Sequence, residues 1–332
     1  MGEDRTLHFE QGTALKSITF LRSIRVFNVG LSSIFCIEDS ESIIWYHRPQ
    51  LRNPIFVAAF EGWNDAGEAA SDSVAWIVDK FSSQLVAEIE GDTYFDYQAV
   101  RPNISVGEGG IRQVSWPRNR IYGISLDDSD RDIVVMLSHE PNYRWKAFCV
   151  DILQVISELK CEEIFTFGSM MAEVPHTRPT RLTGIGSERE RLDALEVLPS
   201  NYEGPTGIIG VLHEYLTQNH LSSTSLWATI PHYVAQRPQP AAMNELLNTF
   251  SALVGVDFDT SDLASQAADW VNHVNDAVAD DDQAVEYVAE LEMRYDSGDF
   301  AETYELADEE FPSAEALAAE VEKFLRDQPP EK

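Results

Sequence analysis

The fold class follows from the stretch NPIFVAAFEGWNDAG (53–67) and the helix-forming segment behind it. PIFVAAF is a continuous apolar run closed by turn residues, which is typical of a strand buried on both faces. In AGEAASDSVAWIVDKF (66–81) apolar side chains recur at helical spacing, with Asn64 or Asp65 as the N-cap. QLVAEIE (84–90) then has strand character. This order predicts a βαβ unit and an α/β fold.

The same alternation continues along the chain. Amphipathic helices are expected at 143–160 and 205–219, between further apolar runs. We predict a mostly parallel sheet, with helices on both faces, that contains residues 54–60, 84–90, 132–137, 163–167 and 225–230. Two short strand-like runs, IRQVSWP (111–117) and RIYGISL (120–126), are expected to form a β excursion outside that sheet.

Four segments are expected along the chain. Residues 1–40 loosely resemble a secretory leader, but Arg25 interrupts the apolar run and no A-x-A cleavage pattern follows. We therefore expect them to be an N-terminal extension or an overcalled start. Residues 41–239 form the α/β core. Residues 240–326 form an acidic helical appendage, with helices at 241–254, 261–279, 283–295 and 313–326, and residues 327–332 form a frayed tail.

The net charge of the protein limits the classes of partner that it can bind. The 332 residues carry a net charge of −32, so that nucleic acid is repelled and nucleic-acid binding is not expected. Residues 241–332 alone hold 24 acidic and 4 basic residues. The acidity of the appendage serves either solubility or binding to a basic partner.

The chain shows no sign of a membrane or a secreted location. No apolar run approaches the roughly 18 to 20 residues of a membrane span. The three cysteines, Cys36, Cys149 and Cys161, sit in apolar surroundings and form no CxxC pair. We therefore expect reduced thiols and a cytoplasmic protein.

Polar loops follow the strand-like runs, and ligands usually bind at the edge where such loops gather. EGWNDAG (61–67) offers Glu61 and Asp65 as an acid/base pair or as ligand anchors with Trp63 and Asn64. The structural alternative is that Asp65 caps the helix and Trp63 packs over the sheet. Glu140, after the run at 132–137, joins the same edge.

His176 and Arg178 stand in VPHTRP (174–179), a loop stiffened by two prolines. Arg178 can bind a carboxylate or phosphate with two hydrogen bonds. His232 repeats the Pro-His arrangement after the last strand, so that the two imidazoles can face one another. Alternatively, each histidine hydrogen-bonds the backbone of a rigid loop or lies at a subunit contact. The catalytic candidates are thus Asp65, Glu140, His176, Arg178 and His232.

Other motifs exclude several classes of chemistry. Thr206 and Gly207 in YEGPTG (202–207) open a helix and can bind an anion, or they form a simple turn and cap. Neither His139-Glu140 nor His213-Glu214 continues as HExxH, and no histidine or cysteine has zinc-ligand spacing, so no metal is expected. GxSxG and the glycine-rich nucleotide loops are absent from the sequence, so we expect no cofactor.

A family resemblance connects these motifs. EGWNDAG, MAEVPHTRPT, EGPTGIIGVLHEY, SLWATIPHYVAQ and the late AVEYVAELEMRYD resemble bacterial, chiefly actinobacterial, relatives of proteasome assembly chaperone 2. The resemblance runs in order from about residue 42 to residue 326. It implies a three-layer α/β core similar to the purine nucleoside phosphorylase-like fold, a C-terminal helical appendage and a homo-oligomer, with trimers favoured.

One departure concerns the C-terminus. Related proteasome-assembly factors often end in a hydrophobic–tyrosine–any residue tail, whereas Glu331 stands here at the tyrosine position. Two hypotheses follow from the sequence. The first is a non-enzymatic oligomeric assembly scaffold that binds a protein client, and the second is a small-molecule-binding protein or enzyme, similar to a hydrolase or phosphorylase, that uses the sheet edge.

Overall fold

The computed structural model describes residues 25–26, 36–37 and 40–298. Its contacts divide the chain into two units, Met1–Glu41 and Ser42–Lys332. In the first unit, β1 (Arg25–Val26) pairs antiparallel with β2 (Cys36–Ile37). Most of the predicted extension, the predicted helix 313–326 and the tail 327–332 lie outside the described residues, and the division into domains stays a prediction.

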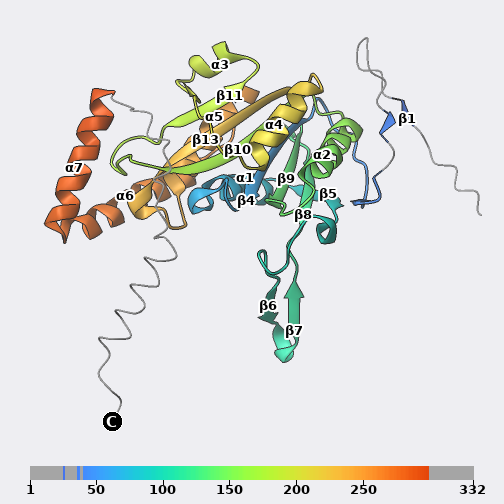
Figure 1. Ribbon diagram of the computed structural model, residues 1–332, viewed down its shortest axis with the longest axis horizontal. Coiled ribbons are helices and arrows are strands. Elements are labelled where there is room, and N and C mark those ends of the chain that lie inside the picture. The colour runs from blue at the N-terminus through green and yellow to red at the C-terminus, as the bar shows by residue number, and fades with distance from the viewer. Residues whose placement is uncertain (1–24, 27–35, 38–39, 299–332) are drawn as a thin grey trace, which may run out of the picture. The chain divides into compact units, whose positions relative to one another are not determined.

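The second unit is built on a nine-stranded sheet with the order β12-β11-β13-β10-β4-β9-β8-β5-β3 (Figure 1). Its strands are β3 (Ile43–Trp45), β4 (Ile55–Glu61), β5 (Ser83–Ile89), β8 (Asn119–Ile124), β9 (Ile133–His139), β10 (Glu163–Ala172), β11 (Leu182–Gly186), β12 (Leu198–Pro199) and β13 (Ser222–Pro231). All five predicted strands belong to this one sheet, as expected.

The sheet is mixed rather than mostly parallel. β13, β10, β4 and β9 are parallel neighbours at its centre, whereas β8 pairs antiparallel with both β9 and β5. The prediction that RIYGISL leaves the main sheet is therefore wrong, because these residues form β8 and fill the place between β9 and β5. IRQVSWP was placed correctly, since β7 (Arg112–Ser115) pairs only with β6 (Asn103–Val106) in a separate two-stranded sheet.

Helices cover both faces of the sheet, which confirms the three-layer α/β core. α1 (Ala69–Lys80) and α5 (Pro240–Val254) pack on one face. α2 (Trp145–Leu159) and α4 (Ile208–Gln218) pack on the other, where Phe148 of α2 meets Phe60 of β4 edge-to-face. A short α3 (Arg189–Asp193) and four 3₁₀ turns complete the connections: η1 (Ala66–Glu68), η2 (Gly91–Thr93), η3 (Glu108–Gly110) and η4 (His232–Val234).

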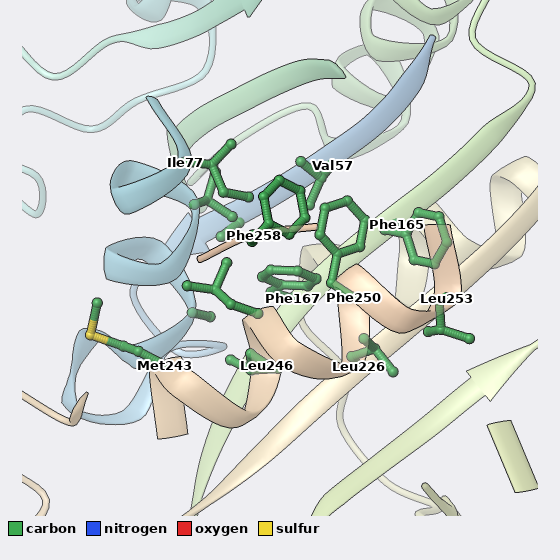
Figure 2. Packing of buried hydrophobic residues seen from close by; sticks show 14 of the residues in the cluster. Val57, Ile77, Phe165, Phe167, Leu226, Met243, Leu246, Phe250, Leu253 and Phe258 are labelled. Carbon is green, nitrogen blue, oxygen red and sulfur yellow. The ribbon is translucent and has the colours of Figure 1, made fainter. Parts of the chain in front are cut away.

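The core beneath α1 and α5 is aromatic at its centre (Figure 2). Phe250 of α5 meets Phe165 and Phe167 of β10 edge-to-face, with ring centroids 5.0 and 5.4 Å apart. It also stacks on Phe258, at 5.6 Å. The first helix of the predicted appendage is thus an integral part of the sheet's packing, and its burial stabilises the core by the hydrophobic effect.

Two longer helices follow α5. α6 (Ser261–Ala279) packs against α5, and α7 (Asp282–Ser297) packs against α6. Both have one narrow buried stripe and a large polar surface, which is typical of helices that cover a core from outside. Among the described residues, no helix is long and apolar enough to cross a membrane.

Candidate functional site

Asp65 accepts hydrogen bonds from free N–H groups at the start of α1, the helix that follows β4. Its Oδ1 accepts hydrogen bonds from the backbone N–H groups of Ala70 (2.8 Å) and Ser71 (3.3 Å) and from the hydroxyl of Ser169 (3.1 Å). The side chain is buried, and burial raises the pKa of Asp65 while these hydrogen bonds oppose the rise. Asp65 therefore satisfies two N–H groups in the first turn of α1, as a capping residue does, although the N-cap position of α1 is Glu68 and Asp65 stands before η1.

Asn64 and Glu140 connect the loops after β4 and β9 to α4. Glu140 Oε1 accepts one hydrogen bond from Asn64 Nδ2 (2.7 Å) and another from the backbone N–H of Ile208 (2.8 Å), the first residue of α4. A Cβ at Gly207 would overlap the side chain of Asn64, so the close approach requires glycine. The proposed anion site at this helix start already holds the carboxylate of Glu140, which the helix dipole favours. Thr206 is exposed.

Two buried oxygens beside this contact, Asn64 Oδ1 and Asp65 Oδ2, have no hydrogen-bond partner within the described part of the chain. Both belong to side chains that are almost completely buried. Buried polar atoms without partners are uncommon and destabilising, so these two are the chemically least satisfied atoms of the edge.

Glu61 and His139 form a titratable pair at the ends of β4 and β9. The two residues are partners in the parallel register, and His139 Nδ1 lies 3.0 Å from Glu61 Oε2. The Glu61 side chain is 47% exposed, so its burial is partial. That partial loss of water first, and then the charges of Glu68 and Asp65, raise the pKa of Glu61 to about 7. Burial lowers the pKa of His139. His139 was not among the predicted site residues. The signal was present, because β4 and β9 are parallel neighbours of equal length that end in Glu61 and His139.

His176 belongs to a second group, packed under α6. The residue is 4% exposed. Its Nδ1 lies 2.7 Å from the hydroxyl oxygen of Tyr233, which also accepts a hydrogen bond from the backbone N–H of His176 (2.9 Å). Its Nε2 lies 3.0 Å from Asn275 Oδ1 of α6. Burial lowers the pKa of His176, so the neutral ring is favoured. Both ring nitrogens are therefore engaged within the protein.

Arg178 ties the same loop to α7. Its guanidinium binds Asp296 with two hydrogen bonds of 2.8 and 2.9 Å and Glu292 with one of 3.0 Å. These carboxylates raise the pKa of Arg178 further above its usual value. Arg178 was predicted to bind a carboxylate or phosphate of a ligand. In the structure it binds carboxylates of this chain instead.

His232 is exposed and stands apart from His176. The ring of Tyr233 contacts both imidazoles, with centroids 5.8 Å from His176 and 5.5 Å from His232. His232 Nδ1 lies 3.2 Å from the carbonyl oxygen of Ala172, and Tyr287 of α7 packs on its ring. The two histidines are thus bridged by a tyrosine rather than aimed at one another across an open site.

The candidates therefore fall into two groups with separate hydrogen-bond partners. The first group, Glu61, Asn64, Asp65 and Glu140, lies at the starts of α1 and α4, where the backbone N–H of Glu140 donates to the carbonyl oxygen of Glu61. The second group, His176, Arg178 and His232, lies under α6 and α7. A small cleft beside the second group is lined by residues of the 174–180 loop, the end of β13, α5 and Trp270. Within the described residues, no group of three or more His, Cys, Asp or Glu side chains can hold a metal ion.

Comparisons with known proteins place the chain in a family. The model of the PAC2 family matches residues 59–278. A PAC2 family protein from Streptomyces avermitilis is 37% identical, with a TM-score of 0.65, over 71% of this chain and 99% of that one. A proteasome-assembly chaperone homologue from Mycobacterium tuberculosis is also 37% identical, with a TM-score of 0.66, over 70% of this chain and 99% of the homologue.

More distant structures share the fold alone. An archaeal proteasome activator from Pyrococcus furiosus is 15% identical, with a TM-score of 0.56, over 71% of this chain and 97% of the activator. No curated protein matched the chain. The matched segment runs from the end of β4 to α6 and includes Asp65, Glu140 and the His176 loop. The chain belongs to the PAC2 family.

Proposed function

We propose that this protein is a non-enzymatic interaction scaffold that assembles into a homo-oligomer, with a trimer favoured, and binds a protein client. A 37% identical relative is a proteasome-assembly chaperone homologue, which supports a role in protein assembly. The client itself is not specified by the residues of this chain. We further propose a cytoplasmic location, in keeping with the free, buried thiols of Cys149 and Cys161.

One observation carries the proposal. The loop of His176 and Arg178, the strongest catalytic candidates, is bonded to the helices that cover it. Both nitrogens of the His176 ring and three hydrogen bonds of the Arg178 guanidinium go to residues of this chain. Side chains held in this way fix the geometry of a loop and of α6 and α7, and they are not available to bind substrate.

Exposed aromatic side chains support the oligomer. Trp63 and Tyr143 follow β4 and β9 at the same edge of the sheet, and Trp116 follows β7. All three are largely exposed. Tyrosine and tryptophan are enriched at the centres of protein interfaces, where the apolar ring is buried and the polar atom finds a partner.

The test is a native pull-down from cells of the source organism, followed by mass spectrometry that retains both proteins and small molecules. We expect an oligomer that carries a protein client. The Trp63→Tyr variant should retain this complex, and the Trp63→Asp variant should lose it. An oligomer that carries a stoichiometric metabolite and no protein would contradict the proposal.

A second candidate function is a small-molecule-binding protein or enzyme that uses the first group. Glu61 favours it, because a carboxylate with a pKa of about 7 beside the imidazole of His139 can exchange protons at neutral pH. A metabolite-library turnover screen tests this candidate, with Glu61→Gln as the matched variant. A turnover that Glu61→Gln abolishes in a folded protein would establish the enzyme and overturn the scaffold.

A further inference from the structure

The hairpin of β6 and β7 has two chemically different faces. In its register Ile104 lies opposite Val114, and Val106 lies opposite Arg112. These four side chains share one face of the hairpin, because paired residues point to the same side and alternate residues point to opposite sides. The other face carries only polar residues: Asn103, Ser105, Gln113 and Ser115. We call the hairpin, residues 103–115, the arm.

The apolar face of the arm is uncovered. Ile104 is 62% exposed, Val106 is 67% exposed and Val114 is 53% exposed, and Ile111 at the turn is exposed as well. The arm stands clear of the main sheet (Figure 1). β6 alternates strictly between polar and apolar residues, which is the pattern of a strand with one buried face, and a two-stranded hairpin alone is only marginally stable. The pattern is therefore that of a surface which another molecule covers.

The charge of the arm selects its partner. Within the arm the charged residues are Glu108 at the turn and Arg112 on the apolar face, in a chain whose net charge is −32. The side chain of Arg112 makes no hydrogen bond or ion pair with the described residues, whereas Arg118, just after the arm, is paired with Glu88. An apolar face whose one charge is an unpaired arginine is complementary to an apolar surface flanked by acids, and such complementarity steers association.

A matching surface lies on α7. Val285, Ala289 and Met293 recur every four residues and form one stripe on this helix, and all three are exposed. The acids Glu286 and Glu290 adjoin the stripe and are exposed too, and Glu290 lies 3.7 Å from Arg294 of the same helix. The stripe thus presents an apolar line with negative charge beside it, whereas the arm presents an apolar face with positive charge on it.

We propose that the arm of one copy of this protein docks on the α7 stripe of a second copy, with Arg112 beside Glu286 and Glu290. This rests on the oligomeric function proposed above and names its contact. The contact joins two different surfaces, so each copy uses its arm on one neighbour and its α7 on another. Contacts of this kind close into a ring when the rotation from one copy to the next closes, and a ring of three copies agrees with the favoured trimer.

Disulfide trapping tests the contact. Val106→Cys and Ala289→Cys are each made in a Cys36→Ser chain, since Cys149 and Cys161 are buried. The two variants carry different tags, are co-expressed and are oxidised. We expect a two-chain product that contains both tags, and none from Ala289→Cys alone. A product from Val106→Cys alone would mean that two arms pair with each other, which overturns the docking on α7.

A matched pair of arm variants tests the apolar face in solution. Val106→Asp places a charge on the apolar face, and Ser105→Asp places the same charge on the polar face of the same strand. We expect the dissociation constant of the oligomer to rise at least about tenfold with Val106→Asp, because a carboxylate without a partner is costly in an interface, and to change little with Ser105→Asp. Equal constants for the two variants would overturn the proposal while leaving the oligomer in place. A wild-type mass of one chain, 37.3 kDa, would instead remove the oligomer and the contact together.

Discussion

Replacement of His176 by alanine separates a structural loop from a catalytic one. The buried ring holds one hydrogen bond to Tyr233 Oη, at 2.7 Å, which contributes about 1 kcal/mol. Its edge-to-face contacts with Tyr233 and Trp270 contribute about 0.5–1.5 kcal/mol. Asn275 is exposed, so water can replace the bond to its oxygen. We expect His176→Ala to lower the free energy of unfolding by about 2 kcal/mol, which corresponds to about 3 °C in melting temperature for a chain of this length.

The pH dependence of this loss gives a second readout. Because burial lowers the pKa of His176, the folded protein favours the neutral ring. As the pH falls through the usual histidine pKa of about 6.5, the unfolded chain binds a proton that the folded chain does not, and the wild type loses stability. The alanine variant lacks this loss. The difference in melting temperature between the two proteins should therefore be largest at pH 8 and should shrink towards pH 5.5.

Thermal melts of both proteins at pH 8 and pH 5.5, followed by circular dichroism, check both statements. His232→Ala is the matched control, because its ring also contacts Tyr233 and Tyr287 edge-to-face but is exposed. Water competes there for its longer hydrogen bonds, to the carbonyl oxygen of Ala172 (3.2 Å) and the hydroxyl of Tyr287 (3.4 Å). We expect the control to lower the melting temperature less than His176→Ala does. Equal melting of His176→Ala and the wild type at pH 8, or a difference that grows in acid, would refute the structural role of His176.

Three further substitutions test the core and the first group. Phe250→Ala should cost about 3–5 kcal/mol, measured by denaturant unfolding, because the ring packs against Phe165, Phe167 and Phe258; a smaller cost would mean that the core relaxes around the cavity. Gly207→Ala should cost about 1–3 kcal/mol in the same assay, because its Cβ overlaps Asn64, and a neutral result would contradict the close approach. Glu61→Gln should raise the melting temperature at pH 8 more than at pH 4.5. Because the pKa of Glu61 is raised to about 7, the wild type loses stability as the pH rises from about 4.5 to 7. An equal effect at both pH values would contradict that shift.

Local pattern predicted the strands but not their order. β4 and β9 are apolar except at their last residues, and the sequence placed both within a residue or two. β8 was misplaced because its burial alternates, so that its sequence looks like a half-exposed hairpin strand. Its antiparallel pairing with both β5 and β9 is a long-range fact that no local pattern encodes.

Gly168 illustrates a second limit. The predicted strand ends at residue 167, whereas β10 continues through Gly168 to Ala172. The ring of Trp227 from the neighbouring β13 lies over Gly168, where a Cβ would come within 2.6 Å of it. The glycine makes room for a ring and does not break the strand, which becomes clear only when the two strands are paired.

The site shows the same division between local and distant information. The cap formed by Asp65 was predicted because its partners, Ala70 and Ser71, are five and six residues away. The bond of Glu140 to Ile208 spans 68 residues, and that of Arg178 to Asp296 spans 118. Candidate catalytic residues could be chosen from the sequence by type and position, but their partners depend on which helices the fold brings over them.

The mass of the purified protein in native mass spectrometry tests the central claim most directly, because the method retains both subunits and bound molecules. The account predicts a multiple of the 37.3 kDa chain mass, with three copies favoured and with no stoichiometric metabolite. A single chain of 37.3 kDa that carries one small molecule would contradict the account, and would make the edge with Glu61 and His139 a ligand site.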